Sequence, residues 1–299
     1  MNDFGVSTKI KVRVITILKL LICGIVVLAI SGNVLVAQQG NVSAKDKKSM
    51  DAVVAAHNSL GGQKIDNIKS LVLTGSQISG IFETRASTSK MTRTGEIVCE
   101  FEIRVLFPDS FVQISRCPDW NKGTIAYFGI LNGKVFNIFT TLQNVVNSST
   151  TQDTSDVALD GWNRLLAGMI MKGIGTPLVF SIDHHDNISI ERKDGLLGTM
   201  VFDVKDKWPV KIDYNVTTQT PVLSKGSDGR MIYTGDSRTE ERSAYVQFSD
   251  RFSVDGIIFP KTITRGDSDK VELTMTINDI KINPNLSKED FNFPEKFAK

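Results

Sequence analysis

The sequence predicts a mainly β protein of the α+β class, an antiparallel meander of strands accompanied by two helices. From Leu71 onward, apolar and polar residues alternate with a period of two, which is the pattern of half-buried strands. Short turns separate these strands, as in an antiparallel sheet. Two segments, 50–60 and 156–172, instead repeat their apolar residues at helical spacing. We therefore expect the two helices to cover the apolar face of one large sheet.

The first helix is predicted to follow Ser49, a suitable N-cap, and to end at Gly61-Gly62, since glycine accepts the left-handed conformation after a helix. Its apolar stripe consists of Met50, Val53, Val54, His57 and Leu60. A histidine on such a stripe is expected to pack against the domain and not to bind a ligand.

The second helix, 156–172, carries a wider apolar face made by Leu159, Trp162, Leu165, Leu166, Met169 and Ile170. Gly173 and Gly175, with Pro177, are expected to end it. The segment 219–229 reads as a flexible loop. Near the C-terminus, Ser287 is expected to cap one helical turn, and Phe291 and Phe293 to pack onto the domain.

The clearest strand alternates an apolar face, Ile97 to Val105 in steps of two, with a face that is mostly charged. Asn132-Gly133 is a strong hairpin turn between two further strands. The other strands are expected at 111–114, 124–131, 134–140, 187–192, 198–205, 209–215, 230–234, 243–250, 256–265 and 271–281.

Residues 1–37 have the layout of a secretory signal peptide. Four basic residues precede an apolar core at 20–30, and cleavage is expected after Ser31 or Ala37. The alternative is an uncleaved N-terminal anchor, although the core is short and Gly32-Asn33 interrupts it. We expect a signal peptide at 1–37, a flexible linker at 38–48 and a single domain at 49–299. The mature chain would then be exported, to a periplasm or otherwise, and would not be transmembrane.

The charge of the chain argues against nucleic acid as a partner. The whole sequence has a net charge of +2, but four Lys/Arg and one Asp lie in 1–37, which leaves the remainder near −1. A nearly neutral domain has no strong field to attract polyanions.

Cys99 and Cys117 are the two cysteines beyond the signal segment, and export would permit a disulfide between them. They lie on the two arms of a predicted hairpin. A three-residue loop places the two cysteines opposite each other. A two-residue loop pairs Val105 with Val112 and Ile103 with Ile114, and puts the cysteines on opposite faces. The apolar pairing favours the second register, and the sequence leaves undecided whether the disulfide forms.

No motif for catalysis, a metal or a cofactor stands out. The chain lacks H-E-x-x-H, G-x-S-x-G and a Walker loop. His184 and His185 lie between two aspartates in a polar segment, and without a second ligand cluster we interpret them as a solvated turn. Glu100 and Glu102 are interpreted as residues that keep a strand face wet. We therefore expect a protein that is not an enzyme.

Many large apolar residues are candidates for the inner side of the fold. A curved sheet with helices in its concavity can leave an apolar cavity, although the same residues can equally form a plain core. The candidates for lining a cavity are Phe101, Ile103, Val105, Trp162, Leu165, Leu166, Met169, Ile170, Met200, Phe202 and Phe248.

Short stretches across nearly the whole mature chain resemble the periplasmic lipoprotein-carrier proteins, LolA/LolB-like and RseB-like, and outer-membrane lipoprotein-sorting homologues. They are 59–62 (SLGG), 68–75 (IKSLVLTG), 101–112 (FEIRVLFPDSFV), 131–135 (LNGKV), 194–203 (DGLLGTMVFD), 254–265 (VDGIIFPKTITR), 280–284 (IKINP) and 291–294 (FNFP). The resemblance implies an unclosed antiparallel β half-barrel wrapped around helices, with a cavity for acyl chains.

Two functions follow as expectations. In the first, the exported protein binds a lipid or lipoprotein acyl chain between the concave sheet and the second helix, in lipoprotein sorting. In the second, the core is packed and the domain is an interaction or sensing module that contacts another envelope protein through edge strands or the segment 219–229. The volume of the interior distinguishes the two hypotheses: an open apolar cavity favours the first, and a packed interior favours the second.

Overall fold

The computed structural model describes residues 44–85, 90–118, 124–131, 134–141, 146–148, 152–175, 177–182, 187–193, 195–225, 231–267 and 270–292. Contacts divide the chain into Met1–Lys48 and a compact unit, Ser49–Lys299. The second unit carries the features discussed below. The predicted signal segment 1–37, the Asn132-Gly133 turn, His184 and His185, and Phe293 lie outside the described residues.

The described strands form one antiparallel sheet of 13 strands in the order β6-β5-β4-β3-β2-β1-β13-β12-β11-β10-β9-β8-β7. Their bounds are β1 Ser70–Arg85, β2 Lys90–Leu106, β3 Ser110–Cys117, β4 Thr124–Leu131, β5 Lys134–Thr141, β6 Val146–Ser148, β7 Val179–Ile182, β8 Ile188–Arg192, β9 Gly195–Phe202, β10 Pro209–Lys225, β11 Met231–Val254, β12 Ile257–Asp267 and β13 Lys270–Ile282. The predicted fold class, a mainly β unclosed half-barrel with helices, is confirmed.

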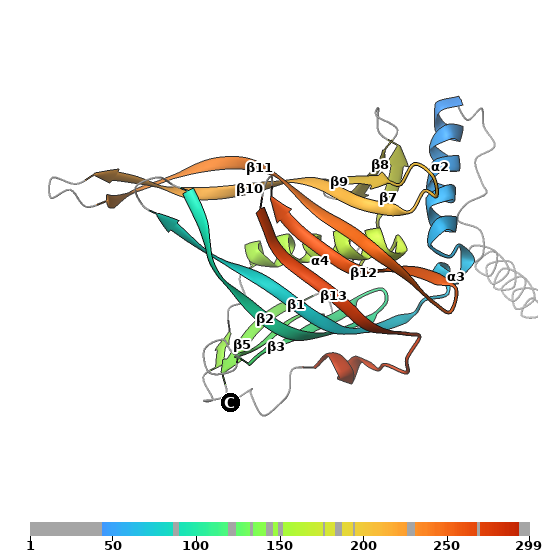
Figure 1. Ribbon diagram of the computed structural model, residues 1–299, viewed down its shortest axis with the longest axis horizontal. Coiled ribbons are helices and arrows are strands. Elements are labelled where there is room, and N and C mark those ends of the chain that lie inside the picture. The colour runs from blue at the N-terminus through green and yellow to red at the C-terminus, as the bar shows by residue number, and fades with distance from the viewer. Residues whose placement is uncertain are drawn as a thin grey trace, which may run out of the picture. The chain divides into compact units, whose positions relative to one another are not determined.

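The chain begins this sheet in its middle and works outward. Strands β1 to β6 step to one edge, the helix α4 (Gln152–Ile170) follows, and β7 to β13 step back from the other edge until β13 pairs with β1. The edge strands β6 and β7 do not pair with each other, so the sheet stays open. Figure 1 shows α4 lying against the inner side of the curved sheet.

Strands β10 and β11 are longer than predicted. Residues 219–225 belong to β10 and pair with β11, so the prediction of a flexible loop at 219–229 is wrong for this part. The described residues of the predicted strands 230–234 and 243–250 are parts of one continuous strand, β11. The sequence pattern failed here because this hairpin has little apolar alternation. Its Thr217, Thr218 and Thr220 are β-branched residues that favour strands, and pairing supplies the backbone hydrogen bonds.

The first helix, α2, spans Ala44–Leu60 and is followed by the short α3, Gln63–Asp66. Residues 44–48 are therefore helical, and Ser49 lies inside the helix and is not its N-cap. No glycine or proline interrupts 44–48, so nothing in that stretch stops the helix. The predicted stripe is also displaced: Ala56 and Leu60 are buried, whereas Met50 and Val54 are each 46% exposed.

Helix α4 begins four residues earlier than predicted and ends at Ile170, before the predicted stop at Gly173. Met171 adopts a left-handed conformation with φ of 51°, and its N–H still donates to the carbonyl of Ala167. A non-glycine residue thus occupies the position after the helix that glycine usually takes.

The hairpin between β2 and β3 has the three-residue loop. Val105 pairs with Phe111 and Ile103 with Gln113, so the apolar register that the sequence favoured is wrong. In the observed register Cys99 and Cys117 are joined by a disulfide.

The C-terminal tail explains why the apolar pattern of β3 predicted the wrong register for the β2–β3 hairpin. The 3-10 helix η1 (Lys288–Phe291), capped by Ser287, places the fully buried Phe291 against Val112, Ile114 and Tyr127. Both faces of β3 are therefore covered, and its apolar residues do not all point to the inside of the sheet. The apolar pattern of β3 therefore does not determine the register in which β3 pairs with β2.

Candidate functional site

The region between α4 and the concave face of the sheet brings together the predicted cavity residues. Nine of the eleven are at most 7% exposed and belong to one hydrophobic cluster. Trp162 and Phe202 are partly buried and pack against the same cluster. The nine buried residues are Phe101, Ile103, Val105, Leu165, Leu166, Met169, Ile170, Met200 and Phe248.

The space under α4 is closely packed in the described part of the chain. The ring of Phe248 on β11 lies so near Gly168 of α4 that an added β-carbon would overlap it. Trp162 packs on Phe111 with 4.6 Å between ring centroids. The side chains predicted to surround a ligand therefore contact one another.

Arg164 provides a polar attachment within this apolar interface. Its Nε donates a 2.6 Å hydrogen bond to the carbonyl of Leu197 on β9, and its guanidinium lies 4.0 Å from the centroid of the Tyr214 ring on β10. Arg164 is 9% exposed. Burial lowers the pKa of this guanidinium and raises the pKa of the Tyr214 hydroxyl. One side chain thus links the helix to two neighbouring strands.

Further polar contacts hold the middle of α4 and the segment that follows it. Near the middle of the helix, Asp160 forms an ion pair with Arg192 of β8 at 2.8 Å. Beyond its end, Lys172 donates to the carbonyls of Asp66 and Ile68 at 3.0 and 2.9 Å, and burial lowers its pKa. The other buried side chains in the described part of α4, among them Leu166 and Met169, are mainly apolar.

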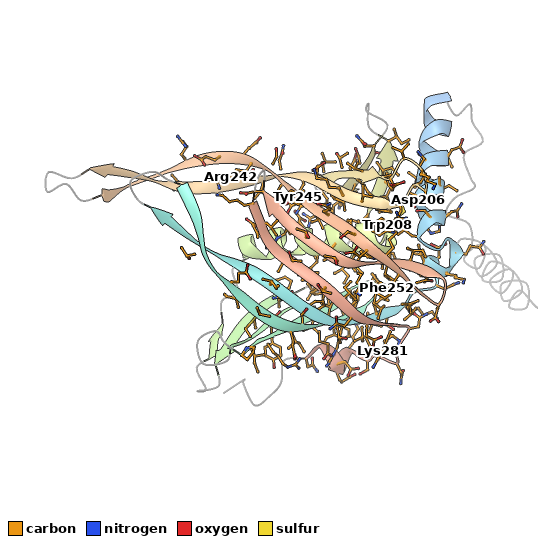
Figure 2. All side chains as sticks on the ribbon, in the orientation of Figure 1. Asp206, Trp208, Arg242, Tyr245, Phe252 and Lys281 are labelled. Carbon is orange, nitrogen blue, oxygen red and sulfur yellow. A yellow bond between two sulfur atoms is a disulfide. The ribbon has the colours of Figure 1, made fainter. Side chains whose placement is uncertain are left out.

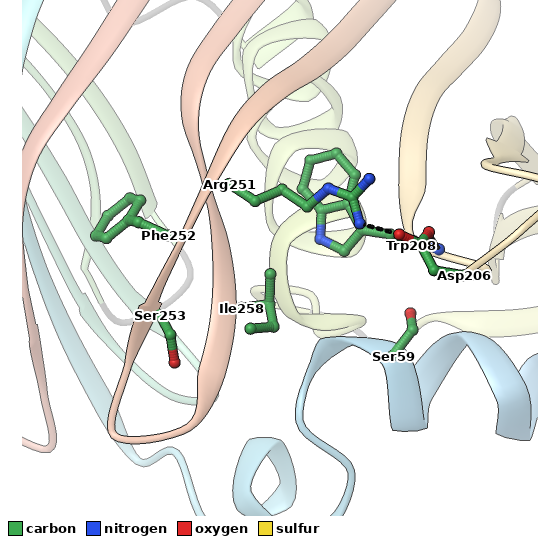
Figure 3. Close-up of a pocket in the computed structure, with 7 residues that line it drawn as sticks. All are labelled: Ser59, Asp206, Trp208, Arg251, Phe252, Ser253 and Ile258. Carbon is green, nitrogen blue, oxygen red and sulfur yellow. Dashed lines mark hydrogen bonds and ion pairs between the residues drawn. The ribbon is translucent and has the colours of Figure 1, made fainter.

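A pocket of about 490 Å³, which we call the Trp208 pocket, lies between the end of α2, the β9–β10 turn and the β11–β12 hairpin (Figure 3). It is lined by Ser59, Asp206, Trp208, Arg251, Phe252, Ser253 and Ile258. Figure 2 shows Asp206 and Trp208 near α2, at some distance along the fold from Arg242 and Tyr245. Sequence reasoning missed this pocket, because its residues come from three separate segments and form no motif.

The rim of the Trp208 pocket carries an ion pair. Arg251 bonds to Asp206, and its guanidinium lies 4.7 Å from the ring centroid of Trp208. The hydrogen bond from Arg251 holds the pKa of Asp206 below its usual value. The two charges offset each other, which leaves the rim close to neutral.

A second pocket, of about 470 Å³, lies along β9 and β10 and is lined by Leu196, Leu197, Gly198, Thr199, Asp213, Tyr214, Asn215 and Ser243. It adjoins the Arg164 attachment, because Leu197 and Tyr214 contact Arg164. Asp213 is paired with Lys211 at 2.6 Å.

No described residues form a cluster of three or more His, Cys, Asp or Glu side chains able to hold a metal ion. Within the same described ranges, no helix is long and apolar enough to cross a membrane. Glu100 lies exposed on the charged face of β2, as the alternating pattern predicted.

No protein-family model and no curated protein sequence matches the chain. Several solved structures are similar to it over most of its length, and three of them are the following. An outer membrane lipoprotein-sorting protein domain from Vibrio parahaemolyticus has 9% identity and a TM-score of 0.43, covering 82% of this chain and 97% of the other. A DUF1329 family protein from Desulfovibrio piger has 9% identity, a TM-score of 0.46 and the same coverage. A LolA superfamily protein from Nitrosomonas europaea has 12% identity and a TM-score of 0.42, covering 80% and 97%.

Two of these three descriptions carry the names of the group that the sequence resembles. At TM-scores below 0.5, function has to be argued from the site itself.

Proposed function

We propose that this chain is an exported, non-enzymatic binding protein that accepts an acyl chain of a lipid or lipoprotein between α4 and the concave face of the sheet. The topology of α4 supports the proposal most directly. In chain order the helix lies between the two edge strands, β6 and β7, and it takes no part in the strand pairing of the described sheet. It can therefore move away while every strand pairing stays intact.

The chemistry of the interface fits an acyl ligand. The facing surfaces of α4 and the sheet are apolar, and Met169 and Met200 lie fully buried in them. Methionine side chains adapt to varied apolar shapes because they are unbranched and flexible. These side chains fill the space between α4 and the sheet, so the proposed ligand would take the place of their mutual contacts as α4 moves outward.

Export is part of the same proposal. The arrangement of basic and apolar residues in 1–37 supports a secretory signal, with cleavage before a mature domain that begins near 49. The Cys99–Cys117 disulfide supports an oxidising compartment such as a periplasm, since disulfides persist there and are rare in the cytosol.

Contact quenching tests the acyl site. The chain has three tryptophans, and Trp162 alone lies on α4. In a variant that keeps only Trp162 (Trp120→Phe, Trp208→Phe), a brominated fatty acid should quench the fluorescence saturably. A variant that keeps only Trp208 is the matched control and should not respond at the same concentration. Native mass spectrometry of the protein made with its own N-terminal segment should show a co-purified lipid mass. Absence of both quenching and bound lipid would refute the proposal.

The close packing of the interior favours a second candidate, an envelope interaction module with a filled core. Nine of the eleven predicted cavity residues are buried against one another. Under this alternative the acyl experiments give no signal, and cross-linking in the envelope recovers a specific protein partner. Cross-linking that recovers none would count against it.

A further inference from the structure

The Trp208 pocket exists because two neighbouring strands separate. β10 begins at Pro209 and first pairs with β11 at Lys211 and Gln247. β11 continues to Val254, and in this part Ser249 and residues 251–254 pair with β12 on one side only. Beyond the last β10 pair, the other side of β11 faces the turn that carries Asp206 and Trp208, as the Arg251–Asp206 bond shows.

Trp208 fills this separation and leaves one donor without an acceptor. Its side chain is 2% exposed, with the ring 6.4 Å from that of Phe248 and the Arg251 guanidinium above it. The indole Nε1 is buried and has no hydrogen-bond partner among the described residues. Buried indole N–H groups normally have an acceptor, and an unpaired one is unfavourable. In Figure 3 the nitrogen is turned toward Ile258, a half-buried side chain that lines the pocket.

The pocket also offers an acceptor. The Ser59 hydroxyl lies within hydrogen-bond distance of two carbonyl oxygens, those of Ala56 at 2.7 Å and Lys207 at 2.9 Å, and donates its one proton to either of them. Its oxygen lone pairs are left to accept from a ligand N–H. Phe252 and Ile258 supply apolar walls. The volume of about 490 Å³ falls within the range usual for small-molecule sites.

We propose that the Trp208 pocket binds an uncharged aliphatic amide. The amide carbonyl accepts from the Trp208 indole N–H once the Ile258 side chain changes rotamer, and the amide N–H donates to the Ser59 oxygen. The aliphatic part lies against Phe252 and Ile258. A charged ligand is disfavoured because Arg251 and Asp206 already neutralise each other at the rim. This site is separate from the proposed acyl site under α4.

Nuclear magnetic resonance of the full domain tests the site with hexanamide as the probe. The three tryptophans give three indole N–H resonances, and Trp208→Phe identifies one of them. Hexanamide should move the Trp208 resonance saturably downfield and leave the Trp162 resonance in place. Methyl hexanoate has the carbonyl without the N–H and should bind roughly tenfold more weakly, the effect of one lost hydrogen bond. Hexylammonium has no acceptor and should produce no shift.

A filling variant keeps the test independent of any misfolding of Trp208→Phe. Ser253 is exposed and lines the pocket, so Ser253→Phe should abolish the hexanamide response. Gln247→Phe, on the same strand but outside the pocket, should retain it. A Trp208 resonance that no probe moves means that the pocket holds water only and overturns the proposal. The same conclusion follows if hexylammonium acts like hexanamide, if Trp162 responds instead, or if Ser253→Phe responds normally.

Discussion

Gly168 of α4 packs directly on the ring of Phe248 of β11, with no room between them for a β-carbon. This contact fixes how closely the helix approaches the inner face of the sheet. A larger residue at 168 has to displace either the ring or the helix, because close-packed interiors leave no free volume. The Gly168–Phe248 contact therefore shows how closely the helix and the sheet pack at the interface where an acyl chain is proposed to bind.

Gly168→Ala should destabilise the protein relative to Gly161→Ala. Both replacements add the same helix propensity on the same helix, but a β-carbon at Gly161 meets nothing within 4 Å. We expect Gly168→Ala to have a free energy of unfolding roughly 1–3 kcal/mol lower than Gly161→Ala, the usual cost of overpacking. Urea unfolding measures the difference. Phe248→Leu should cost less in the Gly168→Ala background than in the wild type, and equal costs would show that the two residues are not coupled.

Arg164→Met should lower the free energy of unfolding by about 1–3 kcal/mol, because the buried carbonyl of Leu197 loses its donor. Arg238→Met is the control, since Arg238 is a largely exposed arginine and should change stability by less than about 0.5 kcal/mol. If α4 moves outward to admit an acyl chain, Arg164→Met should also bind a fluorescent fatty acid faster. Unchanged stability would mean that Arg164 does not attach the helix.

The double variant Cys99→Ser, Cys117→Ser should lose about 3 kcal/mol of stability, because the disulfide closes a chain segment with a sequence separation of 18 residues. Urea unfolding with and without a reductant gives the comparison. The reductant should bring the wild type down to the level of the variant and leave the variant unaffected. A wild type that is indifferent to reductant would contradict the prediction.

Much of the fold could be predicted because strands and helices leave periodic traces in the sequence. β2 is one example: Cys99 to Val105 point inward in steps of two, and Glu100 is exposed as the pattern requires. The apolar face of α4 is another, since Leu165, Leu166, Met169 and Ile170 are all buried.

The errors arose where distant segments decide the local arrangement. The register of the β2–β3 hairpin depends on Phe291, which covers the outer face of β3 from nearly 180 residues away in the chain. The Trp208 pocket depends on where β10 stops pairing with β11, and no local sequence pattern indicates that point. Whether the interior is open or filled depends on the fit of Gly168 to Phe248, which periodicity does not encode.

Asp206 should make stability depend on pH in the acid range. The hydrogen bond from Arg251 holds its folded-state pKa below the ordinary value of 3.8, so the unfolded chain takes up the proton first as the pH falls. The contribution is present above about pH 3.8 and is lost as the pH falls through the folded-state pKa. Because the Asp206–Arg251 pair is partly exposed, we expect it to contribute less than about 1 kcal/mol to the free energy of unfolding. The stability difference between wild type and Asp206→Asn should shrink between pH 6 and pH 2, whereas Asp279→Asn, an exposed carboxylate of β13, serves as control. A constant difference for Asp206→Asn would contradict the prediction.

Phe291→Ala should destabilise the protein by about 3–5 kcal/mol, because a fully buried ring is removed from a small cluster. The loss of packing should be confined to the outer face of β3. Val112 and Ile114 lie on the outer face of β3 and would become exposed, so binding of a hydrophobic dye should increase at a urea concentration where both proteins remain folded. Asn292→Ala, at the neighbouring exposed position, should change neither property. If dye binding stays at the wild-type level, another part of the chain covers β3, and the tail does not account for the register in which Cys99 meets Cys117.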